Sequence, residues 1–179
     1  MNYTLPSNFY PTPDWLADKM LSKISDEDIS VCQCKFLEPS AGTGNLVEAI
    51  LRRCGWVRRS EEEKEGHEPC NSGNSDRNWL KFGKQINIHC FEKDEILRFA
   101  LSKQFRARII GDDFLETPVY VAYDAIIMNP PFEDGDKHLL KALDIIKNGG
   151  VVVCLLNAET LKNPYTNTRR LLQRRLLEM

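Results

Sequence analysis

Five short apolar runs, separated by amphipathic segments, are the feature that most limits the fold of this 179-residue chain. Each run has the length of a buried strand, and a helical pattern or a polar loop follows it. The runs are Lys35–Leu37, Ile86–Phe91, Ala107–Ile110, Asp124–Met128 and Val151–Leu156. This alternation predicts an α/β fold, a Rossmann-like three-layer sandwich in which a mostly parallel sheet has helices on both faces.

Apolar residues at helical spacing predict the helices that cover this sheet. Three of them lie between strand runs, at residues 46–54, 96–101 and 139–146. Asn148, Gly149 and Gly150 are expected to end the last one. A further helix is expected near the N-terminus, where Thr12 can cap it and Pro13 fits its first position.

The size of the chain predicts one domain over residues 1–179. Within it, residues 1–34 would carry an N-terminal cofactor motif and helix. Residues 57–80 are expected to form a mobile polar surface insertion, because this composition cannot offset its ordering entropy by apolar burial. We expect no metal site, since His67 and Cys70 lack a second ligand pair at matching spacing.

Charge and hydropathy indicate which classes of protein this chain does not resemble. The 24 Lys and Arg residues nearly balance the 26 Asp and Glu residues, so no global charge signature of a nucleic-acid binder is present. The N-terminus lacks the pattern of a signal peptide, and no apolar stretch is long enough to span a membrane. These features predict a soluble cytoplasmic protein.

Two glycines, Gly42 and Gly44, lie in the expected turn between the first strand and the next helix. Open α/β sheets bind ligands at this place, and glycine allows close backbone approach and positive φ. Val47 replaces the third glycine of the dinucleotide motif, which disfavours a nicotinamide cofactor. Glu38 would repel a pyrophosphate but suits a cationic ligand such as S-adenosylmethionine. A tight structural turn is the alternative interpretation.

Acidic residues also follow the second and third predicted strands. The two oxygens of Glu92 can bind both hydroxyls of a ribose, although an acid at a helix N-terminus is also favoured by the helix dipole. Asp113 can accept a hydrogen bond from an adenine amino group while Phe114 packs against the ring. A helix cap followed by a core phenylalanine explains Asp113 and Phe114 equally simply.

The most specific segment is Asn129–Phe132, with the sequence Asn-Pro-Pro-Phe. Consecutive prolines stiffen a loop and remove two backbone donors. If the Asn129 side-chain oxygen and the Pro130 carbonyl each accept an N–H of an exocyclic amine, its lone pair turns toward a methyl donor without a strong base. Phe132 offers a stacking face for a base rotated out of a duplex. A proline-stiffened loop with a core phenylalanine is the alternative.

The order of these motifs resembles the class I S-adenosylmethionine-dependent amino-methyltransferases, and most closely the gamma-type adenine-N6 DNA methyltransferases of restriction-modification systems. The resemblance implies a catalytic set of Asn129, Pro130, Pro131 and Phe132. It implies a cofactor site of Tyr10, Thr12, Glu38, Ser40, Ala41, Gly42, Gly44, Asn45, Glu92, Lys93, Asp113, Phe114 and Asn129. The resemblance also implies that Thr12 helps to hold the carboxylate of the cofactor's methionine part. The family fold adds a C-terminal antiparallel hairpin, which we expect this chain to lack.

The resemblance implies an enzyme that uses S-adenosylmethionine to methylate adenine N6, with DNA as partner. An RNA base or a protein glutamine amide is the alternative substrate. An inactive cofactor-binding or interaction module is the alternative from another class. The oligomeric state is left open by the sequence.

Overall fold

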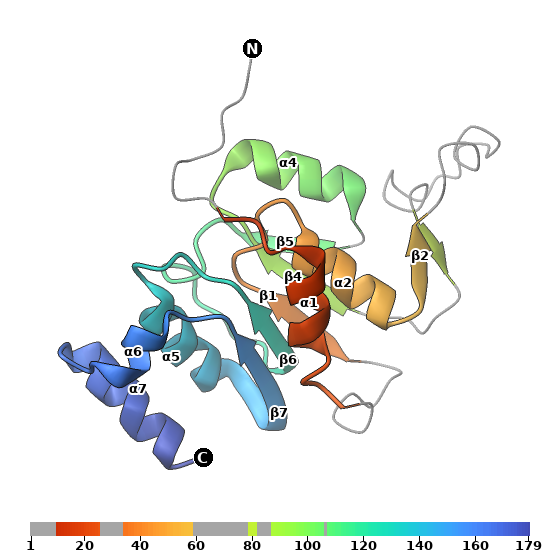
Figure 1. Cartoon of the computed structure of the whole chain (residues 1–179). Coiled ribbons are helices and arrows are strands. Elements are labelled where there is room, and N and C mark those ends of the chain that lie inside the picture. The colour runs from red at the N-terminus through yellow and green to blue at the C-terminus, as the bar shows by residue number, and fades with distance from the viewer. Residues whose placement is uncertain (1–9, 26–33, 59–78, 82–86, 106) are drawn as a thin grey trace.

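The computed structural model describes residues 10–25, 34–58, 79–81, 87–105 and 107–179. Its centre is a five-stranded sheet (Figure 1). The strands are β1 (Lys35–Glu38), β4 (Asn87–Phe91), β5 (Ala107–Gly111), β6 (Tyr123–Met128) and β7 (Ile146–Cys154). They lie in the order β5-β4-β1-β6-β7, and every neighbouring pair is parallel. The predicted parallel α/β fold is therefore confirmed.

Helices cover both faces of the sheet (Figure 1). They are α1 (Asp14–Leu21), α2 (Asn45–Arg53), α4 (Glu95–Gln104), α5 (Gly135–Ile145), α6 (Ala158–Lys162) and α7 (Asn167–Leu177). One hydrophobic cluster joins α1, α2 and α4 to one face, and a second joins α5 and α7 to the other. Successive strand residues alternate between them, as Phe36 and Leu37 do. Burial of both faces explains the nearly continuous apolar strands.

The C-terminal helix α7 is fixed to α5. Leu172 is fully buried in the second cluster, against the apolar side of α5. Two ion pairs join the same helices, Arg169 with Asp136 at 3.9 Å and Arg175 with Asp144 at 2.9 Å. Because α5 follows directly after the Asn-Pro-Pro-Phe loop, these contacts also hold the base of that loop.

The start of α1 differs from the prediction by one residue. The helix begins at Asp14, and Pro13 occupies the capping position without a side-chain hydrogen bond. Thr12 does not cap the helix, because its hydroxyl oxygen accepts a hydrogen bond from the Asn129 side chain instead.

The last strand also differs from the prediction. β7 begins at Ile146, directly after α5, and not at Val151. Its pairing with β6 is irregular: Tyr123 pairs with Ile146, but the next pair is Ala125 with Val151, so the register shifts between them. Gly149 has a φ of 76° there, so the glycines predicted to end a helix instead allow an irregularity within the strand.

The ends of the predicted insertion 57–80 form a small antiparallel sheet of β2 (Trp56–Arg58) and β3 (Trp79–Lys81). Residues 59–78 of that insertion lie outside the described residues, as do Ile86, His67 and Cys70. In the part that is described, no helix is both long and apolar enough to cross a membrane. The same residues contain no group of three or more His, Cys, Asp or Glu side chains that could hold a metal ion.

The strand order defines where a ligand can bind. From β1 the chain continues through β4 to β5 at one edge, and then returns to β6 on the other side of β1. The loops that leave β1 and β6 therefore diverge, which opens a crevice at the carboxyl ends of these two strands. The glycine turn follows β1, and Asn129 follows β6.

We expect Gly44→Ala to destabilise the chain more than Gly149→Ala. Both glycines have positive φ, 88° and 76°, so an alanine costs roughly 1–2 kcal/mol of backbone strain at either position. A Cβ on Gly44 would also lie 2.3 Å from Cε2 of Phe105, whereas one on Gly149 has nothing within 4 Å. Overpacking should add about 1–3 kcal/mol at Gly44 alone. Urea unfolding measures both, and equal losses would contradict the close packing of α2 on α4.

Candidate active site

A cleft opens at the carboxyl ends of β1 and β6. Its cavity volume is about 160 Å³, and it is open to solvent on one side. It is lined by Tyr10, Pro11, Thr12, Ser40, Ala41, Gly42, Thr43, Asn45, Leu46, Glu92, Asn129, Pro130, Pro131 and Phe132. The predicted site residues did not include Pro11, Thr43 and Leu46, although their places inside or beside the motifs could have indicated them.

Glu92, at the end of β4, is hydrogen-bonded to the glycine turn. Its Oε2 accepts a hydrogen bond from the Gly42 amide at 2.6 Å, and its Oε1 accepts one from the Asp94 amide at 2.8 Å. The neighbouring Ala41 amide donates to the Phe91 carbonyl at 2.9 Å. A carboxylate has about four acceptor positions, so Glu92 can still accept hydrogen bonds from ligand hydroxyls in the cleft.

Glu38 lies behind the cleft wall and is fully buried. Its Oε1 accepts a hydrogen bond from the Ser40 amide at 2.9 Å, while Oε2 has no partner within the described residues. Burial raises the pKa of Glu38 to about 8, and the nearby Glu92 contributes in the same direction. The raised pKa favours the protonated form of Glu38, and a cation in the cleft beside Ser40 would favour its ionised form.

Asn129 is held by the N-terminal segment. Its Nδ2 donates to the Tyr10 carbonyl at 3.3 Å and to Thr12 Oγ1 at 3.1 Å. A carbonyl can only accept, so the amide nitrogen must face it, and this settles which way the amide points. Oδ1 is left as an acceptor without a partner among the described residues, on a side chain that lines the cleft.

The rest of the Asn-Pro-Pro-Phe loop forms the outer wall. Pro130 is buried, and the Pro131 carbonyl accepts a hydrogen bond from the Asp134 amide at 3.1 Å. Phe132 is 51% exposed, and its ring centroid lies 5.3 Å from that of Tyr10. Phe132 is therefore not the core residue that the alternative interpretation of this loop expected.

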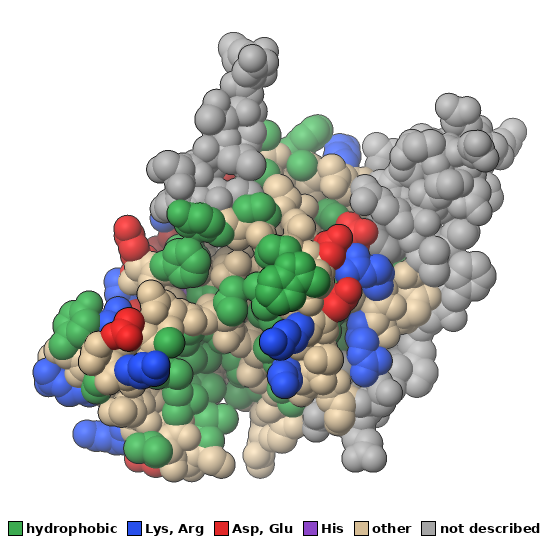
Figure 2. Space-filling model, in the orientation of Figure 1, with side chains coloured by type: hydrophobic (Ala, Val, Ile, Leu, Met, Phe, Trp, Pro, Cys, Tyr) green, Lys and Arg blue, Asp and Glu red, His purple; other side chains and the backbone are tan. Residues whose placement is uncertain are grey.

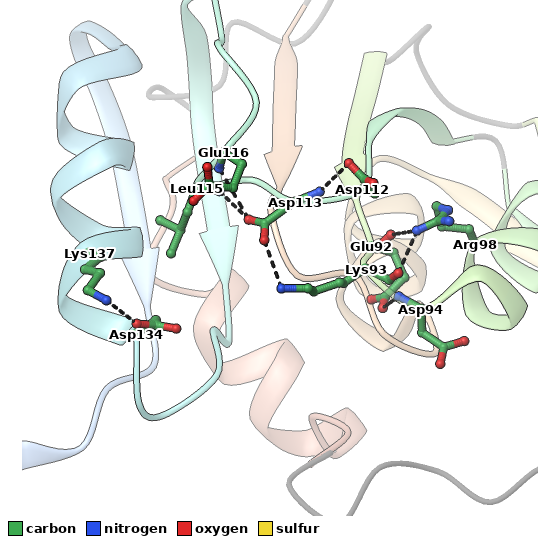
Figure 3. Close-up of polar contacts among 10 residues, drawn as sticks. All are labelled: Glu92, Lys93, Asp94, Arg98, Asp112, Asp113, Leu115, Glu116, Asp134 and Lys137. Carbon is green, nitrogen blue, oxygen red and sulfur yellow. Dashed lines mark hydrogen bonds and ion pairs between the residues drawn. The ribbon is translucent and has the colours of Figure 1, made fainter.

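Asp113 and Phe114 do not line the cleft. Phe114 is 2% exposed and packs between the rings of Phe91 and His138, because the apolar space under the β5 loop takes its side chain. Asp113 accepts a hydrogen bond from the Leu115 amide and pairs with Lys93 at 3.0 Å (Figure 3). This geometry matches a turn followed by a core phenylalanine, and not the predicted contact of Phe114 with an adenine ring.

Lys93 and Gly44, also predicted to bind the cofactor, lie outside the cleft lining. The Lys93 ammonium extends toward Asp113, away from the neighbouring Glu92 (Figure 3). Gly44 closes the glycine turn: its amide donates to the Ala41 carbonyl at 2.8 Å, and it occupies the N-cap position of α2.

No protein-family model matches this sequence, and no curated protein matches it. Solved structures do match. A class I S-adenosylmethionine-dependent methyltransferase from Listeria monocytogenes is 14% identical with a TM-score of 0.62, and the match covers 98% of this chain and 54% of that protein. This chain thus spans about half the length of the Listeria protein.

Two further matches show the same architecture. An RNA methyltransferase from Pyrococcus horikoshii is 21% identical with a TM-score of 0.57, over 94% of this chain and 70% of that one. The plantazolicin methyltransferase, solved with a substrate analogue and S-adenosylhomocysteine, is 13% identical with a TM-score of 0.55, over 92% and 56%. At these identities the likeness concerns the fold, and this chain has the fold of the class I S-adenosylmethionine-dependent methyltransferases.

Proposed function

We propose that this chain transfers a methyl group from S-adenosylmethionine to an exocyclic amino group, and that its substrate is adenine N6 in DNA. The observation that carries the proposal is the Asn129 side chain. Its nitrogen is held by Tyr10 and Thr12, so its oxygen remains as a fixed acceptor in the cleft.

A fixed acceptor addresses the central difficulty of methylating such an amine. The nitrogen lone pair is delocalised into the ring, so the amine is a poor nucleophile. When Asn129 Oδ1 and the Pro130 carbonyl each accept one N–H, the nitrogen becomes more tetrahedral and its lone pair is freed. Alignment of the reactants can contribute up to about 7–11 kcal/mol, and the spare proton leaves to water after transfer.

The cleft residues fit the proposed cofactor. When bound, S-adenosylmethionine supplies a methyl group on a positively charged sulfur. Gly42 lets the backbone approach a ligand closely, and Glu92 retains acceptor positions for hydroxyl groups. Oε2 of Glu38 is buried and has no partner among the described residues, so it suits a cationic ligand on the other side of Ser40.

The aromatic entrance supports a planar substrate. The rings of Tyr10 and Phe132 are 61% and 51% exposed, and Figure 2 shows hydrophobic side chains gathered on the face where α1 begins. Of the acidic and basic residues drawn in Figure 3, only Glu92 lines the cleft. We propose that the base enters past Tyr10 and Phe132, because their exposed rings offer stacking faces.

An RNA base is the second candidate substrate. It is favoured by the structural likeness to the RNA methyltransferase from Pyrococcus horikoshii, with a TM-score of 0.57. The cleft chemistry is the same for either nucleic acid, because it acts on the amino group and the ring.

Transfer of a labelled methyl group to DNA, RNA and a glutamine-containing peptide tests the proposal. We expect DNA to be methylated, and Asn129→Ala to lower kcat by at least about 100-fold, as the loss of one preorganised polar group does elsewhere. Calorimetry should show S-adenosylmethionine bound within about threefold of the wild-type affinity, since a neutral hydrogen bond contributes little net binding energy. Asn163→Ala, which removes an exposed amide outside the cleft, is the control and should change neither value.

Each other outcome has a defined meaning. Transfer to RNA but not to DNA would reject the DNA substrate and retain the chemistry. Cofactor binding without transfer to any of the three substrates would support an inactive module. Equal loss of cofactor affinity and turnover in Asn129→Ala would contradict the role of its amide.

We expect the affinity for S-adenosylmethionine to rise with pH until about pH 8. Burial raises the pKa of Glu38 to about 8, and a bound cation lowers that pKa, so binding releases a proton. Affinity should therefore increase from about pH 6, by at most about tenfold per pH unit, and level off near the pKa. Calorimetry at a series of pH values measures this. Glu38→Gln cannot titrate and should remove the increase, whereas an identical slope in both proteins would contradict the assignment.

A further inference from the structure

Thr12 lies where the N-terminal segment meets the catalytic loop. It is 5% exposed and lines the cleft. Its Oγ1 accepts a hydrogen bond at 3.1 Å from Nδ2 of Asn129, a residue 117 positions later in the chain. The Tyr10 carbonyl accepts from the same nitrogen, at the longer distance of 3.3 Å. Of the two oxygens that orient the Asn129 amide, the Thr12 hydroxyl is therefore the closer one.

Because Thr12 accepts this hydrogen bond, its own hydroxyl proton remains available for a second hydrogen bond. A threonine hydroxyl has one donor and two acceptor positions, and Thr12 uses an acceptor position for Asn129. No described residue accepts the Thr12 hydroxyl proton. A nearly buried donor without an acceptor is unfavourable, so a ligand oxygen in the cleft would improve its environment.

We propose that Thr12 is a positioning residue that couples the orientation of the Asn129 amide to the presence of the cofactor. This inference rests on the proposed function. An anionic oxygen of a bound ligand would accept a hydrogen bond from the Thr12 hydroxyl, and this hydrogen bond would make Thr12 Oγ1 a stronger acceptor for Asn129 Nδ2. The amide is then held most firmly when a methyl donor is in place, and its Oδ1 is ready for the substrate amine.

Thr12→Val tests the coupling with little change of shape, because valine replaces the hydroxyl by a methyl group. The Asn129 nitrogen would keep only the Tyr10 carbonyl. Since a neutral hydrogen bond is modest in strength, we expect kcat to fall by about tenfold. Thr12→Ser keeps the hydroxyl and should restore most of that loss. In the Asn129→Ala background Thr12→Val should have no further effect, because no amide is left to orient.

A second measurement does not depend on turnover. In a ¹⁵N-labelled full chain, the Asn129 side-chain amide resonance can be assigned by its loss in Asn129→Ala. Added S-adenosylhomocysteine should shift this resonance in the wild type and in Thr12→Ser, and leave it unshifted in ligand-saturated Thr12→Val. Thr160→Val removes another buried threonine hydroxyl, at 4% exposure outside the cleft, and should retain the shift and the wild-type kcat.

If Thr12→Val does not fold, Thr12→Ser against Thr12→Ala provides the same comparison, because these two differ only in the hydroxyl. A wild-type kcat and an unchanged amide shift in Thr12→Val would overturn the coupling and leave the proposed function standing. So would a loss in Thr12→Val that adds fully to that of Asn129→Ala. Absence of methyl transfer by the wild type to any substrate would instead overturn the proposed function.

Discussion

The two hydrogen bonds from Asn129 to the N-terminal segment hold the candidate site together. They join residues 117 and 119 positions apart and fix the direction of the one amide that the proposed chemistry needs. On the opposite wall Glu92 has a similar role, since its carboxylate accepts a hydrogen bond from the amide of Gly42, which lies 50 positions earlier in the chain. Each wall of the cleft is thus closed by one polar side chain that reaches the backbone of another segment.

The fold could be predicted from the sequence because both faces of the parallel sheet are buried. This burial makes the strands continuous apolar runs that end at polar residues. The position of the cleft followed from the same pattern. The glycine turn after β1 and the Asn129 loop after β6 adjoin once these strands are neighbours, and β1 does pair with β6. Local sequence and the family resemblance together therefore named most of the residues that line the cleft.

Side-chain partners that depend on tertiary packing could not be predicted in this way. Thr12 fits a helix cap by its local sequence, but its partner comes from β6. Phe114 follows a strand end as a cofactor residue would, yet the space between β5 and α5 buries it. The early start of β7 at Ile146 arises from pairing with Tyr123, because local propensity favours a helix end at the glycines that follow.

The orientation of the Asn129 amide can be measured directly by neutron diffraction from crystals of the deuterated protein, since nitrogen-bound deuterons are then visible. The account predicts two deuterons on the amide nitrogen, directed at the Tyr10 carbonyl and at Thr12 Oγ1, with the amide oxygen free of any protein donor. Deuterons that point into the cleft, with the oxygen turned to the Thr12 hydroxyl, would contradict it.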